Sequence, residues 1–288
     1  MILIYTIFLS FLLSDTLIYQ NPLLSKKGFS LNVNMKGNLI PDAPKELSPV
    51  EIDLIKSEAK DFIPDPVTAN DIIIMETNFG TMEFVFYNQE APNHSYNFKK
   101  LANSGFYDKT IFHRIIPGFM AQGGDILTRD LNEKNDGTGN PGWTVDEEFN
   151  NIAHVKGILS MARSQDVNSA GSQFFICFDN APHLNNKYTV FGKLISGYEV
   201  LEKIESLKSE ASYILEKSVD TLPDNAENNF LEYNYKNRKK YIRIPNNEDK
   251  NKFREDIYNR LKNIHKTKRP VKIIKLRVRD ENVEEDSN

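Results

Sequence analysis

The chain has 288 residues and a net charge of −4, with 40% hydrophobic and 26% charged residues. This composition is typical of a globular protein of one or two domains and excludes disorder along the whole chain. The charge supplies no overall basic field, so we do not expect nucleic-acid binding. The single cysteine, Cys177, excludes an internal disulfide framework and a cysteine-rich zinc site.

The N-terminal residues 1–13, MILIYTIFLSFLL, have the length of a signal-peptide hydrophobic region and are too short to span a membrane as a helix. We expect residues 1–20 to be a signal peptide, which would direct the protein to the secretory pathway, either for secretion or to an organelle reached through it. No Lys or Arg precedes the apolar run, so an uncleaved anchor and a buried N-terminal strand remain the alternatives.

Residues 21–67 are predicted to form a flexible or irregular lead-in. Lys26, Lys27 and Lys36 lie in a stretch without acidic residues, which could be a second targeting signal or a linker. One short helix could begin after Ser48, with Pro49 at its first position, where a missing N–H costs nothing.

Regular structure is predicted from residue 71 onward. Residues 71–77 and 81–87 read as a β-hairpin across an NFG turn. Residues 91–107 read as an amphipathic helix that ends near Gly105. Its apolar side is predicted to group Tyr96, Phe98, Leu101 and Ala102.

Short strands and glycine turns fill most of the next hundred residues. The strands are predicted at 110–116, 119–122, 157–162, 173–177 and 190–193, and a second helix follows Gly197. Strands and helices do not alternate as βαβ units, so the pattern favours an antiparallel barrel with helical caps over a Rossmann fold.

Four sequence motifs carry a resemblance to a known family. They are FYDKTIFHRIIPGFMAQGGD (106–125), DGTGNPGWTVDEEF (136–149), GILSMARSQDVNSAGSQFFI (157–176) and HLNNKYTVFGKL (183–194). In this order they resemble the cyclophilin family of peptidyl-prolyl isomerases, from about residue 71 to 207. RPVKIIKLRVRD (269–280) is similar to the closing strand of the same family.

The resemblance implies a mainly β fold: a closed antiparallel eight-stranded barrel capped by two helices, with a partly helical insertion before the last strand. The cyclophilin-like domain would span 68–281, with the insertion at about 208–268 and an acidic tail at 282–288. A longer loop adds only about 0.6 kcal/mol of closure entropy per doubling of its length.

The resemblance also implies an activity, rotation about X–Pro bonds in the service of protein folding. No bond breaks in this reaction, so we expect no cofactor and no metal. A donor aimed at the prolyl nitrogen would localise its lone pair and favour the twisted amide. Arg114 is the candidate donor, because its guanidinium is permanently charged and rigid.

The other site residues follow from the family pattern. Gln122 would act with Arg114 and hold a substrate carbonyl. The remaining substrate-binding residues would be His113, Phe119, Met120, Ala162, Arg163, Gln173, Phe175, His183, Leu184 and Tyr188. Expected partners are proline-containing peptides and unfolded protein segments, and we expect a monomer. The alternative is a non-catalytic scaffold that only captures such segments.

Three positions depart from the family pattern. His183 stands where many members carry Trp, which argues against tight binding of the cyclic peptide cyclosporin. Tyr188 stands where many carry His, and Arg163 where Asn is frequent. Tyr can still pack and donate a hydrogen bond, so we expect activity to survive.

The insertion contains one amphipathic stretch. Phe253, Ile257, Leu261 and Ile264 recur at helical spacing. This stripe could dock on the barrel or contact a partner, and docking within the chain is favoured. Residues 266–279 are basic and predict a strand with one charged face, with contact to an anionic surface as the alternative.

Overall fold

The computed structural model describes residues 16–19, 31–34 and 47–280, except 131, 225, 227, 228, 236, 237, 263, 264 and 268. The chain divides into two compact units, Met1–Glu46 and Leu47–Asn288. In the first unit, β1 (Thr16–Tyr19) and β2 (Leu31–Asn34) pair in antiparallel fashion. Most of the predicted signal peptide, the three lysines of the lead-in and the acidic tail lie outside the described residues. None of the helices in the described ranges combines the length and the apolar character that crossing a membrane requires.

The second unit begins with a capped helix, α1 (Pro49–Asp61). The Ser48 hydroxyl accepts from the Glu51 N–H, and the Glu51 carboxylate accepts from the Ser48 N–H, which completes a capping box. Ile52 and Ala59 are buried in the main core. The folded unit therefore starts at Leu47, ahead of residue 68, because this helix covers part of the core instead of forming an irregular lead-in.

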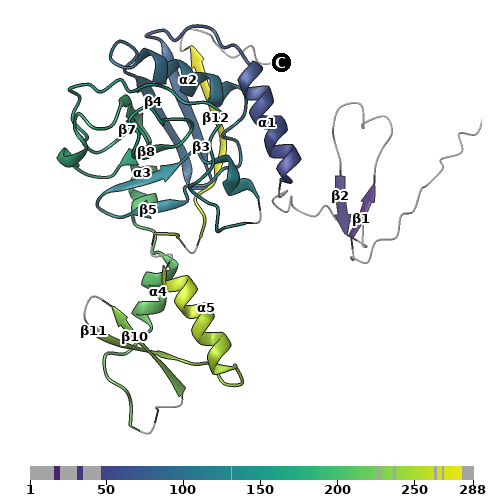
Figure 1. Ribbon diagram of the computed structural model, residues 1–288, viewed down its shortest axis with the longest axis vertical. Coiled ribbons are helices and arrows are strands. Elements are labelled where there is room, and N and C mark those ends of the chain that lie inside the picture. The colour runs from purple at the N-terminus through teal and green to yellow at the C-terminus, as the bar shows by residue number, and fades with distance from the viewer. Residues whose placement is uncertain are drawn as a thin grey trace, which may run out of the picture. The chain divides into compact units, whose positions relative to one another are not determined.

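One eight-stranded antiparallel sheet dominates this unit (Figure 1). Its strand order is β12-β3-β4-β9-β7-β8-β6-β5. In chain order the strands are β3 (Asp71–Thr77), β4 (Gly80–Phe86), β5 (Arg114–Ile116), β6 (Met120–Gly123), β7 (Ile158–Met161), β8 (Phe174–Cys177), β9 (Val190–Ser196) and β12 (Ile273–Asp280). The predicted hairpin and the predicted strands are all present, in the predicted antiparallel arrangement.

The sheet is an open, strongly curled half-barrel, and the prediction of a closed barrel was wrong in this respect. Strands β5 and β12 are the two ends of the order. The segment before β5 meets the start of β12 and the residues just before it: the Phe112 N–H donates to the Val271 carbonyl at 2.9 Å, and the N–H of Ile273, the first residue of β12, donates to the Thr110 carbonyl at 2.8 Å. Pro270 lies in this segment and has no N–H to extend a ladder. The end of the insertion faces β5 instead.

Helices α2 (Pro92–Asn103) and α3 (Tyr198–Glu205) pack against the sheet. Phe98 of α2 is fully buried, with its ring centroid 5.4 Å from that of Phe174 and 5.0 Å from that of Phe191. Leu101 and Ala102 are buried as well, but Tyr96 is 37% exposed. Positions two apart do not share a helix face, so Tyr96 was wrongly grouped with Phe98.

The insertion is a small structure with its own core. It contains α4 (Glu210–Glu216), the antiparallel hairpin β10 (Phe230–Tyr235) and β11 (Arg238–Arg243), and α5 (Lys250–Lys262), with α4 beside α5 (Figure 1). Its core is formed by Ala211, Ile214, Leu231, Ile242, Ile244, Phe253, Ile257 and Leu261. The predicted stripe on α5 thus packs within the chain, but against the insertion itself instead of the barrel. Ile264 lies outside the described residues.

Candidate active site

Nine of the predicted site residues line one cavity of about 170 Å³. They come from strands β5 and β6, from β8, and from the loops that follow β7 and precede β9. The nine are Arg114, Phe119, Met120, Gln122, Ala162, Arg163, Phe175, Leu184 and Tyr188. None of the described residues that line the cavity is acidic, so its two guanidinium groups meet no carboxylate there.

The wall of this cavity is apolar and well packed. Met120, Phe175 and Leu184 are buried in one cluster, and Phe119 packs against it partly exposed. The Phe175 ring meets the Tyr188 ring edge-on, at 5.8 Å between centroids and 84°. Aromatic faces and a polarizable Met fit a flat aliphatic ring such as that of proline.

His154 holds this wall from behind, and it was not predicted. Its ring stacks on Phe175 at 5.9 Å between centroids and 15°. The His154 Nδ1 lies 3.0 Å from Asn185 Oδ1, and the Nε2 lies 3.1 Å from Ser160 Oγ. Burial lowers the pKa of His154 despite the hydrogen bond to Asn185, which favours a neutral ring. In the sequence, an isolated histidine before a strand carries no sign of this role.

Arg114 and Gln122 lie opposite each other because β5 and β6 pair in that register. The Arg114 guanidinium donates to Gln122 Oε1 at 3.5 Å, and Gln122 Nε2 donates to Gln173 Oε1 at 2.9 Å. Burial lowers the pKa of Arg114 from its usual value, but a guanidinium stays protonated at neutral pH. The result is a fixed cation at the edge of an apolar notch.

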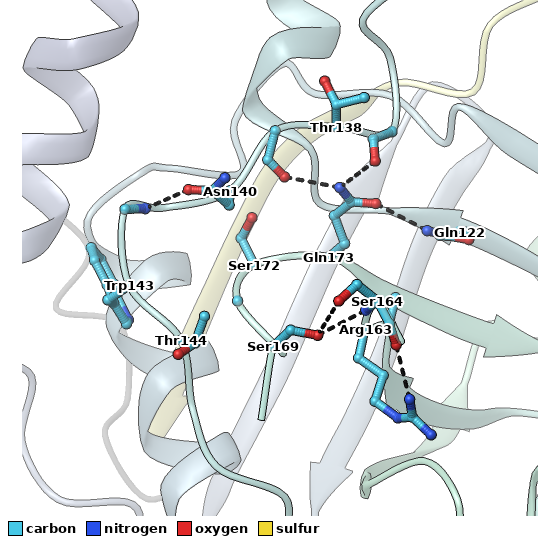
Figure 2. Close-up of a pocket in the computed structure, with 15 residues that line it drawn as sticks. Gln122, Thr138, Asn140, Trp143, Thr144, Arg163, Ser164, Ser169, Ser172 and Gln173 are labelled. Carbon is cyan, nitrogen blue, oxygen red and sulfur yellow. Dashed lines mark hydrogen bonds between the residues drawn. The ribbon is translucent and has the colours of Figure 1, made fainter. Parts of the chain in front are cut away.

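A second, polar cavity of about 680 Å³ adjoins the first and shares Gln122, Ala162 and Arg163 with it. Gln173 lies at its centre: Nε2 donates to the carbonyls of Gly137 at 2.9 Å and Gly139 at 2.8 Å (Figure 2). Gln173 therefore lines this neighbouring cavity and not the apolar one, as the family pattern implies for an adjoining groove.

Arg163 and Tyr188, two of the departures from the family pattern, contact each other. The Arg163 guanidinium lies 4.8 Å from the Tyr188 ring centroid and donates to the Lys187 carbonyl at 2.9 and 3.0 Å. Figure 2 shows this side chain directed away from Gln173. The pair thus acts as one structural element at the border of the two cavities.

The remaining two predicted residues lie beside the apolar cavity instead of lining it. His183 is exposed, and its ring lies 5.4 Å from the Phe119 ring. His113 precedes Arg114, and its buried Nδ1 has no hydrogen-bond partner among the described residues. Burial lowers the pKa of His113 to about 4; the charge of Asp125 opposes this shift, and those of Arg114 and Lys266 add to it.

In the described part of the chain, no three His, Cys, Asp or Glu side chains form a group that could hold a metal ion. The arrangement offers hydrogen-bond donors and an apolar notch. It can therefore bind a peptide and stabilise a twisted amide.

An apolar notch beside a fixed guanidinium, on a curled antiparallel sheet, is the kind of site that binds proline and turns its amide bond. The model of the family described as "Cyclophilin type peptidyl-prolyl cis-trans isomerase/CLD" matches residues 72–223. The chain belongs to this family and is a peptidyl-prolyl cis-trans isomerase.

Relatives from distant organisms agree. The chain is 43% identical over 136 residues to a peptidyl-prolyl cis-trans isomerase of Synechococcus elongatus, a match that covers 47% of this chain and 88% of the relative. It is 39% identical over 160 residues to one of Acinetobacter baylyi, over 54% of this chain and 82% of the relative. A crystal structure of a Cryptosporidium parvum cyclophilin-type isomerase is 27% identical, with a TM-score of 0.50 over 73% of this chain and 97% of that one.

Proposed function

We propose that the apolar cavity holds the proline ring of an X–Pro segment while the Arg114 guanidinium donates to the prolyl nitrogen. Amide resonance sets a rotation barrier of about 18–20 kcal/mol. A donor on the nitrogen withdraws the lone pair from the carbonyl and favours the twisted amide. Each 1.36 kcal/mol of preference for that state gives about a tenfold faster rate. The observation that carries this proposal is that Arg114 and the apolar wall line the same cavity.

The groups around the notch fit a bound peptide backbone. Gln122 Nε2 is an amide donor at the cavity and would hold a substrate carbonyl, whereas Gln173 Nε2 already donates to the carbonyls of Gly137 and Gly139. The Ala162 N–H already donates to the Gln173 carbonyl at 2.9 Å, so a contact from Ala162 would use its own carbonyl. The substrates that we propose are extended, proline-containing peptides and unfolded protein segments.

Three further properties belong to this proposal. The apolar cavity is complete within one chain, which supports a functional monomer. His183 beside Phe119 offers a smaller ring than an indole, which supports weak binding of cyclosporin. The apolar run at residues 1–13 supports entry into the secretory pathway. N-terminal sequencing of the mature protein from its native cell tests that last property, and an intact Met1 would refute cleavage.

The proposed binding mode is tested by amide chemical-shift mapping with a short Ala–Pro peptide. We expect shifts at residues 114–122, 162–163 and 173–175, together with faster cis/trans exchange of the peptide. A control peptide with Ala in place of Pro should leave the apolar wall unshifted. Shifts confined to another surface, with exchange still accelerated, would place the site elsewhere.

A further inference from the structure

The last residues of the insertion, His265–Lys266–Thr267, return to the sheet beside the active site. We call them the return segment. They contact both β5, which carries Arg114, and the loop 133–137 at the border of the polar cavity. The sequence predicts docking of the insertion or contact with a partner and assigns it no part in the site, so this contact gives it a further role.

The first contact fixes the edge of β5. The Ile115 N–H donates to the His265 carbonyl at 2.8 Å. Because β5 is the last strand of the sheet, its outer N–H groups have no strand partner. The return segment supplies that partner one residue after Arg114, through main-chain atoms that a side-chain substitution at position 266 leaves in place.

The second contact fixes the loop. Lys266 Nζ lies 3.0 Å from Asp136 Oδ2 and 3.0 Å from Glu133 Oε2. The Glu133 side chain is 72% exposed, whereas that of Asp136 is 13% exposed and that of Lys266 is 23% exposed. Exposed ion pairs contribute little, so the pair with Asp136 is the one that holds the loop.

The loop in turn holds the amides of the groove. Gly137, next to Asp136, has a φ of +90° and donates its N–H to the buried Asp125 carboxylate. Its carbonyl accepts from Gln173 Nε2 at 2.9 Å, and Gln173 Oε1 accepts from Gln122 at 2.9 Å. Polar contacts on either side of the Asp136–Gly137 peptide bond therefore link Lys266 to Gln122, the amide proposed to grip the substrate.

We propose that Lys266 is a positioning residue for the peptide groove, through which the insertion sets how firmly the enzyme holds its substrate. The inference rests on the proposed function in one respect, namely that Gln122, held in place by Gln173, grips the peptide backbone. Strand β5, which carries Arg114, keeps its main-chain hydrogen bond to His265 whichever side chain stands at position 266. Loss of the ammonium should therefore weaken binding and leave the rotation step nearly unchanged.

The test is steady-state isomerisation of a peptide with residues on both sides of an Ala–Pro bond, using the full chain. Lys266→Met should raise KM about three- to tenfold with kcat within about twofold, as expected for the loss of one charge-assisted contact. Lys266→Arg should restore KM to within about twofold. The matched control is Lys208→Met, because Lys208 pairs with Glu216 inside the insertion at 2.8 Å and is exposed. It should leave both constants unchanged.

Three results separate the possible failures. If Gln173→Ala raises KM and Lys266→Met does not, this inference alone is overturned. If neither variant changes KM, both proposals fail: the binding of the peptide backbone by the Gln122–Gln173 pair and the positioning role of Lys266. A fall in kcat at unchanged KM for Lys266→Met would also contradict the inference. Should that variant fold poorly by circular dichroism, Asp136→Asn replaces it, with the same expected KM and the same refuting results.

Discussion

Acidification should destabilise the folded protein through His113, which lies beside the proposed catalytic cation. Its pKa is lowered to about 4, first by burial and then by the charges of Arg114 and Lys266, although Asp125 opposes the shift. In the unfolded chain the pKa of the same histidine is about 6.5. Between these two values the unfolded state binds more protons, so the free energy of unfolding falls as the pH falls.

The magnitude follows from those two pKa values. At pH 7 both states are mostly deprotonated at His113, and the effect is near zero. At pH 5 the unfolded state is protonated and the folded state is not, which amounts to about 2 kcal/mol. Below about pH 4 both states carry the proton, so His113 causes no further loss there.

The assay is urea unfolding of wild type and His113→Gln at pH 7 and pH 5. His94 and His154 also have lowered pKa values, chiefly because of burial, so the wild type should lose more than the share of His113 alone. The variant lacks only the contribution of His113. Between pH 7 and pH 5 its free energy of unfolding should therefore fall by about 2 kcal/mol less than that of the wild type. Equal losses in both proteins would refute this account of His113.

Three more outcomes are expected. Ser48→Ala removes the capping box with Glu51, which should cost about 1 kcal/mol and lower Tm by about 2–4 °C in a scanning melt; an unchanged Tm would show that the cap is not needed. A double-mutant cycle of Arg163→Ala and Tyr188→Leu, followed by urea unfolding, should give a coupling of about 0.5–1 kcal/mol from the cation–π contact; strict additivity would contradict the contact. His183→Trp should tighten cyclosporin binding at least about tenfold by calorimetry, and no gain would show that this position does not limit affinity.

Much of the fold could be predicted because its signals are local. The alternation in 81–87 follows the two-residue period of a half-buried strand, and in the structure Met82 and Phe84 are buried. Ser48 and Pro49 marked the start of α1 correctly. The burial of α1 against the core was missed, because it depends on contacts distant in sequence, such as the Leu47 N–H to the Arg129 carbonyl at 2.9 Å.

In the site, too, the residues in linear motifs could be predicted from the sequence, and the contacts between distant segments could not. Arg114, Phe119 and Phe175, which the linear motifs named as site residues, line one cavity. The sequence could not show that the Arg163 guanidinium lies over the Tyr188 ring, because that contact depends on how two loops meet. It also could not show that the insertion returns to the groove through Lys266. Both features are tertiary contacts between segments that carry no matching pattern.

The most direct test of the central claim separates binding from rotation in Arg114→Ala. Exchange NMR of an Ala–Pro peptide should show cis/trans exchange near the uncatalysed rate, while the peptide Kd changes by less than about threefold, because the apolar wall remains. Arg243→Ala, which removes an exposed guanidinium from β11, should behave as wild type. Exchange by Arg114→Ala at the wild-type rate would contradict the claim that this guanidinium drives the rotation.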